Sequence, residues 1–67
     1  MYNLTEEISV SIPDGYEIFW QKSQFKVILF IKDIPVSFIN LSDNEANLDD
    51  AKRAGIVLLR GGGIKLS

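Results

Sequence analysis

The sequence contains no cysteine and no histidine. Without cysteine a disulfide or a thiolate metal site is impossible, and without histidine the commonest zinc ligand and the commonest general base are missing. The sequence also has little excess charge of one sign, and the net charge of -2 is too small to attract a nucleic-acid backbone over distance. We therefore expect a protein that is not an enzyme, with no metal, no cofactor and no small-molecule substrate.

Long apolar runs are absent as well. The longest, residues 27–31, is far too short to span a bilayer. The N-terminal stretch "MYNLTEEISV" has no basic region followed by an apolar run, so we expect no signal peptide. These features predict a cytoplasmic protein that does not associate with membranes. If a phage encodes it, the expected location is the host cell cytoplasm.

What the chain does have is a globular composition. Its 67 residues are 46% hydrophobic and 24% charged, which predicts one small domain spanning residues 1–67. A domain of this size buries only about 60% of its unfolded surface and is marginally stable unless its core is supplemented. With disulfides excluded, we expect either a well-packed core or a partner chain.

Alternating apolar residues predict four strands. Ile8, Val10 and Ile12 alternate with serines, which is typical of a half-buried strand over about residues 6–12. The sequence "PDG" then favours a three-residue hairpin loop into a second strand at about 16–21. Turns near "QKSQ" and "KDIP" separate two further strands, at about 25–32 and 36–41.

The loop lengths predict the register of the sheet. An even-length loop near "QKSQ" pairs Phe19 with Ile28, and a two-residue loop at Asp33 and Ile34 pairs Ile28 with Ile39. In this register one face of the sheet is apolar throughout and forms the core. Its members are Ile8, Val10, Ile12, Tyr16, Ile18, Trp20, Phe25, Val27, Leu29, Ile31, Val36 and Phe38.

The hydrophobic period changes from two residues to that of a helix after Asn47. Asn47 can cap a helix over about residues 48–60, and the run "GGG" ends it before a flexible tail at 61–67. A shorter helix followed by a strand over 56–60 stays open. The predicted fold is α+β: a four-stranded antiparallel meander sheet with one C-terminal helix packed on one face.

One helix leaves the second face of the sheet uncovered. Exposed apolar clusters rimmed by polar residues are typical of association sites. The predicted face consists of an apolar centre and a polar rim: Phe19, Ile28, Phe30 and Ile39, with Glu17, Lys26 and Lys32 around them. In an alternative arrangement, the tail folds back and covers part of this cluster.

We therefore expect a small protein-interaction module that binds a protein partner or a second copy of itself. A twofold homodimer would add the core that a marginal domain lacks. Acidic, cysteine-free chains of this length are frequent among phage and mobile-element accessory proteins, so an accessory or inhibitor role is one expected form of such a module.

A second function is suggested by the order of elements over residues 15–60. Trp20 precedes a turn that contains Lys22, Phe25 opens the next strand, and the late helix holds "AKRA". This layout resembles the three-strand-plus-helix domain of plant ethylene-response transcription factors and the arm-binding domains of phage integrases. Those families place the sheet against DNA, so the resemblance implies nucleic-acid binding as the alternative.

The charges depart from that resemblance. The sheets of those families are rich in arginine, whereas the same face here offers only Lys26 and Lys32 beside Glu17. Phosphate contacts dominate the affinity of such complexes, so two lysines on an acidic chain supply little.

Overall fold

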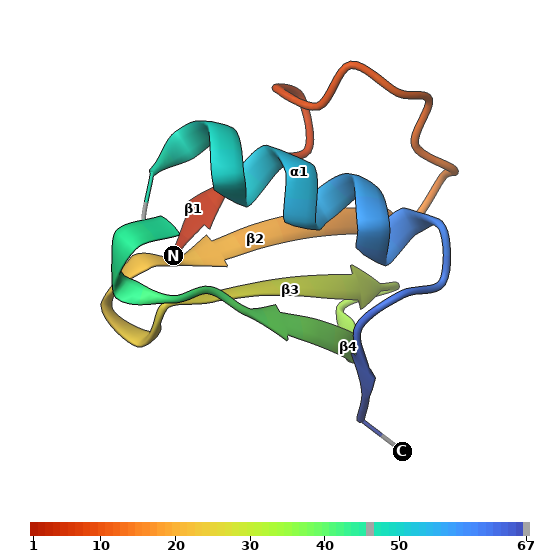
Figure 1. The fold of residues 1–67 in the computed structure, drawn as a ribbon. Coiled ribbons are helices and arrows are strands. Elements are labelled where there is room, and N and C mark those ends of the chain that lie inside the picture. Colours follow the sequence, from red (N-terminus) through yellow and green to blue (C-terminus); the bar gives the residue numbers. More distant parts are fainter. Residues whose placement is uncertain (46, 67) are drawn as a thin grey trace.

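The computed structural model describes residues 1–45 and 47–66, and over these residues the chain forms one antiparallel sheet with one helix packed on it (Figure 1). The strands follow one another across the sheet in chain order. The predicted α+β class is confirmed, but the sheet has five strands rather than four. They are β1 (Tyr2–Asn3), β2 (Tyr16–Gln21), β3 (Lys26–Ile31), β4 (Ile34–Asn40) and β5 (Ile64–Lys65), and the helix is α1 (Leu48–Leu59).

The predicted strand over residues 6–12 is wrong, because the segment that pairs with β2 lies nearer the N-terminus. In β1, Tyr2 lies opposite Trp20. The side-chain oxygen of Asn3 then accepts a hydrogen bond from the backbone N–H of Thr5 at 2.9 Å. Such an Asx turn bends the backbone, so the chain leaves the sheet after two residues of pairing.

Residues 6–12 form a loop that arches out from the sheet beside α1 (Figure 1). Ile8 is buried in the core, whereas Val10 is exposed. The predicted turn does form, since Tyr16 N–H donates to the Pro13 carbonyl at 3.1 Å and Gly15 has a φ of +86°. It leads this loop into β2 instead of joining two strands.

The pairing of β2 with β3 is as the sequence predicts, with Trp20 opposite Val27. Between the two strands lies a short 3-10 turn, Lys22–Gln24. Phe25 closes this turn with a φ of +51°, so β3 begins one residue later than predicted.

The turn between β3 and β4 differs from the prediction by one position. Its central residues are Lys32 and Asp33, whose φ angles of +51° and +67° are those that a tight type I′ hairpin turn requires. As a result, Ile31 pairs with Ile34.

A β-bulge after Pro35 then makes Val36 an extra residue in β4. Proline has no N–H to donate to a neighbouring strand, so an irregular position suits it. Beyond the bulge Ile28 pairs with Phe38, not with Ile39, which corrects the predicted register. A net shift of one residue moves every later side chain of β4 to the other face.

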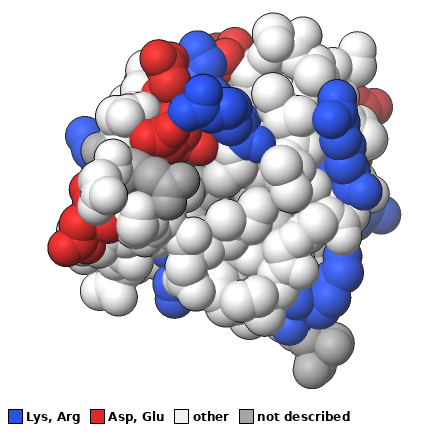
Figure 2. All heavy atoms as spheres, in the orientation of Figure 1, with Lys and Arg blue, Asp and Glu red and all other residues white. Residues whose placement is uncertain are grey.

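The helix α1 is confirmed and ends one residue earlier than predicted. Asn47 accepts a hydrogen bond from the backbone N–H of Asp50 through its side-chain oxygen at 3.0 Å, the contact expected of an N-cap. Residues 56–59 belong to the helix and not to a strand. Most of the acidic atoms visible in Figure 2 lie on the side of the molecule where α1 begins, which suits the positive end of the helix dipole. No helix among the described residues has the length and apolarity needed to cross a membrane.

The predicted flexible tail over residues 61–67 is also wrong within the described residues. Ile64 lies opposite Phe38 in β5, and the backbone N–H of Leu66 extends this pairing with a hydrogen bond to β4. The final residue of that prediction, Ser67, lies outside the described residues.

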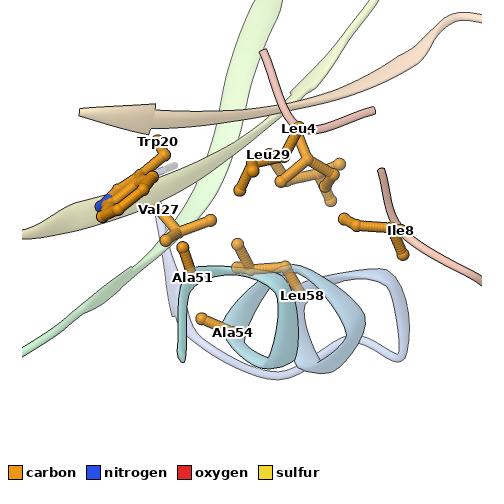
Figure 3. Close-up of a cluster of buried hydrophobic side chains, with 9 residues drawn as sticks. Leu4, Ile8, Trp20, Val27, Leu29, Ala51, Ala54 and Leu58 are labelled. Carbon is orange, nitrogen blue, oxygen red and sulfur yellow. The ribbon is translucent and has the colours of Figure 1, made fainter. Parts of the chain in front are cut away.

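The core lies between the sheet and α1, with the N-terminal segment closing one side (Figure 3). Side chains from β2 and β3 point toward the helix, and two residues of the N-terminal segment lie beside them. The buried apolar residues are Leu4, Ile8, Ile18, Trp20, Val27, Leu29, Ala51, Ala54 and Leu58.

Candidate interaction face

The side of the sheet away from α1 carries no covering element over the described residues, and we name it the open face. Ile18 and Trp20 point into the core, so the alternating neighbours in β2 point the other way. Directly paired residues of adjacent strands share a face, which extends the assignment across the sheet. The open face comprises Asn3, Glu17, Phe19, Gln21, Lys26, Ile28, Phe30, Pro35, Phe38, Asn40, Ile64 and Leu66.

The centre of the open face is an apolar cluster of Phe19, Ile28, Phe30 and Phe38. Phe19 pairs with Ile28, and Ile28 pairs with Phe38, so these three form a row across the sheet. The rings of Phe19 and Phe30 meet edge to face, with centroids 5.2 Å apart and planes at 82°. All four side chains are half-buried by their neighbours. The cluster is therefore one packed surface and not a set of isolated hydrophobes.

A hollow of about 310 Å³ opens beside this cluster. Met1 and Leu66 stand at its edge and are 71% and 48% exposed. Apart from Gln21 and Lys26 its wall is apolar, formed by Met1, Ile28, Phe30, Pro35, Phe38 and Leu66.

Three of the four predicted apolar site residues lie together on the open face: Phe19, Ile28 and Phe30. Ile39 does not, because the bulge in β4 turns it toward α1, where it packs against the core. Phe38 takes the place predicted for Ile39. The signal that could have found it was Pro35, which is compatible with a bulge but not with a regular inner strand.

The predicted polar rim is only partly on this face. Glu17 accepts a hydrogen bond from the Asn3 side chain at 3.5 Å, near one end of β2. At the other end, the ammonium of Lys26 lies 5.0 Å from the ring centroid of Phe38, a cation–π geometry. Lys32 lies in the β3–β4 turn beside Gly15 and is exposed.

The C-terminal tail leaves the apolar cluster open. It continues the sheet sideways as β5, and Ile64 remains 53% exposed. Leu66 lines the hollow together with Ile28, Phe30 and Phe38. Residues 61–66 therefore border the cluster as an edge strand, and the predicted folding back of the tail is seen only as this contact of Leu66.

A second hollow, of about 420 Å³, lies at the Glu17 end of the sheet and is lined by Asn3, Thr5, Glu6, Glu7 and Glu17. Within the described part of the chain, no group of three or more acidic side chains is placed to hold a metal ion. Beside this hollow, a hydrogen bond to Glu7, followed by loss of solvent and the negative charge of Glu7, raises the pKa of Tyr2. Tyr2 is thus kept protonated, which does not suit a base or nucleophile.

The charge on the open face is balanced, with one carboxylate at Glu17 and one ammonium at Lys26. Nucleic-acid surfaces carry clustered lysines and arginines because phosphate contacts dominate their affinity, and one ammonium beside one carboxylate supplies little of that attraction.

Searches of protein-family models, of curated proteins and of solved structures found no match to this chain. The case for a function therefore rests on the geometry and chemistry of the open face.

Proposed function

We propose that the chain is a protein-binding module without enzymatic activity, and that it binds through the open face. The observation that carries this proposal is the packed cluster of Phe19, Ile28, Phe30 and Phe38 on a sheet face that α1 does not cover. Aromatic side chains at the centre of a patch with a polar rim are the usual composition of a protein interface.

The size of such a patch sets the kind of binding that it supports. The largest apolar patch on a monomeric protein is about 300–600 Å². Covering about 400 Å² on each of two partners contributes about 20 kcal/mol at about 25 cal/mol per Å². Lost translational and rotational freedom opposes this by about 4–15 kcal/mol, and ordering of side chains adds to that cost. The surplus is that of a reversible interaction, in which the polar rim decides the affinity.

The nucleic-acid alternative uses the same face and rests on its three phenylalanines. Aromatic side chains on a sheet can stack unpaired bases, and Lys26 lies beside Phe38. Aliphatic Ile28 lies in the middle of the row, however, and Glu17 repels phosphate at one end. Both features favour a protein partner.

The proposal is tested by placing a charge in the cluster. Two kinds of binding are measured: self-association, and binding of peptides that were selected from a random-sequence library for binding to the parent chain. Phe30→Asp is expected to weaken both by at least about tenfold. The physical reason is that a carboxylate in an apolar contact loses its hydration without gaining a partner. Sedimentation equilibrium and peptide titration measure the two effects, and circular dichroism checks that the variant is folded.

The matched control is Ile34→Asp, which adds the same charge to an apolar residue that is 62% exposed and lies opposite Ile31 on the other face. This variant should bind as the parent does. If Phe30→Asp also binds as the parent does, the open face is not the binding site. A single-stranded oligonucleotide that binds the parent, with an affinity that falls steeply as salt is raised, would favour the nucleic-acid alternative instead.

A further inference from the structure

We propose that the partner of the open face is a second copy of this chain, packed face to face about a twofold axis that runs across the strands. This inference rests on the proposed function and adds the identity and orientation of the partner. It is derived from the positions of the charges and of the apolar row.

The open face consists of three rows that the strand register defines. The middle row runs from Asn3 through Phe19, Ile28 and Phe38 to Ile64 and is apolar apart from Asn3 at its end. One outer row begins with Glu17, which pairs with Phe30, and the other begins with Gln21, which pairs with Lys26. The two outer rows are four residues apart along the strand, about 13 Å at about 3.3 Å per residue.

A twofold axis along the middle row brings opposite charges together. The rotation places the row of Glu17 over the row of Lys26 in the second copy, and the same contact occurs again on the other side of the axis. Glu17 and Lys26 belong to neighbouring strands about 4.8 Å apart, and packed sheets lie about 10 Å apart. Both side chains are long enough to meet across that gap.

The other in-plane axis, parallel to the strands, gives the opposite result. When it runs between β2 and β3, it places Glu17 one strand spacing from Glu17 of the second copy and Lys26 one strand spacing from Lys26. Like charges in contact oppose association, so the charge pattern selects the axis that runs across the strands. In that arrangement the apolar row meets itself, as the centre of an isologous interface does.

The broad side of the molecule is large enough for such a dimer. A standard interface covers about 800 Å² per partner, which is close to one fifth of the 4304 Å² surface of this chain. The shortest extent of the fold, 20 Å, is that of two packed layers, so the open face is one of the sides measuring 31 by 27 Å. An interface of standard size therefore has to include Met1 and Leu66 at the edge of the hollow.

Charge reversal tests the orientation. Glu17→Lys leaves two like-charge contacts in a homodimer, and Lys26→Glu does the same with the opposite sign. Each variant alone is expected to dimerise at least about tenfold more weakly than the parent. When the two variants are mixed, both contacts join opposite charges, so the heterodimer should form with an affinity within about threefold of that of the parent dimer. Sedimentation velocity on the separate and mixed proteins measures these affinities.

A second pair of variants controls for net charge. Asp49→Lys and Arg53→Glu change the charge at exposed positions of α1, on the other side of the sheet from the open face. Each should dimerise as the parent does, separately and mixed. A parent chain that stays monomeric at every concentration, or a dimer that neither charge reversal weakens, would overturn the inference. The proposed function would survive that result if peptides bind the parent and fail to bind only the Phe30→Asp variant. The partner would then be a different protein.

Discussion

At the scale of single residues, Tyr2 links β1 to the turn that follows it. Its ring meets Trp20 edge to face with centroids 6.3 Å apart. Hydrogen bonding to the Glu7 side chain is the largest cause of the raised pKa of Tyr2. A raised pKa in the folded state means that the protonated form is favoured. The contribution of this contact to folding stability is therefore fully present below the pKa that Tyr2 has in the unfolded chain. It is lost as pH rises through the pKa that Tyr2 has in the folded protein.

This contact predicts an alkaline titration above the usual tyrosine value of 10.0. The chain has two tyrosines, so Tyr16→Phe leaves Tyr2 as the one that titrates. In that background Glu7→Gln should lower the pKa of Tyr2, because the carboxylate charge is removed. Absorbance of ionised tyrosine measures the shift, and Glu6→Gln serves as the neighbouring control. An identical titration with and without Glu7→Gln would show that Glu7 does not hold the hydroxyl.

At the scale of elements, the link from α1 to β5 decides where the C-terminus lies. Gly61 N–H donates to Leu58 and Gly62 N–H donates to Val57, the two hydrogen bonds of a Schellman motif. Both Gly61 and Gly63 have a positive φ. A Cβ at Gly63 would lie 2.7 Å from the Phe38 carbonyl oxygen, whereas nothing lies within 4 Å of one at Gly61. Gly63 therefore permits β5 to approach β4.

The two glycines give a matched pair of variants. Gly61→Ala is expected to destabilise the fold by about 1–2 kcal/mol, the cost of a left-handed conformation for a residue with a side chain. Gly63→Ala should lose at least about 1 kcal/mol more, because its Cβ also meets the backbone carbonyl oxygen of Phe38 in β4. Urea unfolding measures both changes, and hydrogen exchange at the Leu66 amide reports whether β5 has detached. If the two variants lose the same free energy of unfolding, the close contact at Gly63 does not contribute to the loss.

The elements also show what sequence patterns can and cannot specify. The β2–β3 hairpin and α1 could be predicted because their signals are local: an even loop length and a capping residue at Asn47. The short edge strands could not, since two residues of pairing leave no periodic pattern. Ile8 belongs to the core although it lies in a loop, so the alternation of Ile8 and Val10 with serines resembled the pattern of a strand without forming one.

The candidate site shows the same division. Phe19, Ile28 and Phe30 were correctly placed because the β2–β3 register fixed them. The choice between Phe38 and Ile39 depended on the bulge after Pro35, a single extra residue whose position follows from how the whole sheet packs.

At the scale of the whole molecule, the fold has the surface of a monomer. A folded monomer of 7.5 kDa exposes about 4,200 Å² by the usual scaling with mass, and this chain exposes 4304 Å². Association through the open face would thus join chains that are already compact. This is the reason to expect that Phe30→Asp yields a folded monomer, since the substitution changes a half-buried residue outside the core.

The N-terminal segment contributes two of the buried core residues to this compact fold. Leu4 and Ile8 are 0% and 7% exposed, although neither belongs to a strand or helix. Ile8 lies against α1 at Gly55, where an added Cβ would be 2.6 Å from the Ile8 side chain. Glycine thus gives the helix the close approach that this contact needs. A domain of this size has little core to spare, so it relies on apolar groups supplied by a loop.

Removing one of these groups should therefore affect the whole fold. Leu4→Ala is expected to lower the free energy of unfolding by about 2–5 kcal/mol, the usual cost of a cavity left by a buried leucine. Small domains have total stabilities near the lower end of about 5–15 kcal/mol, so this loss would leave a large unfolded population. Val10→Ala, an exposed change in the same segment, should cost less than about 1 kcal/mol. Fluorescence of the single tryptophan, Trp20, during urea unfolding measures both variants, because Trp20 is buried in the same core. If Leu4→Ala were as stable as Val10→Ala, the N-terminal segment would not be packed on the core in solution, and Met1 would not stand at the edge of the open face.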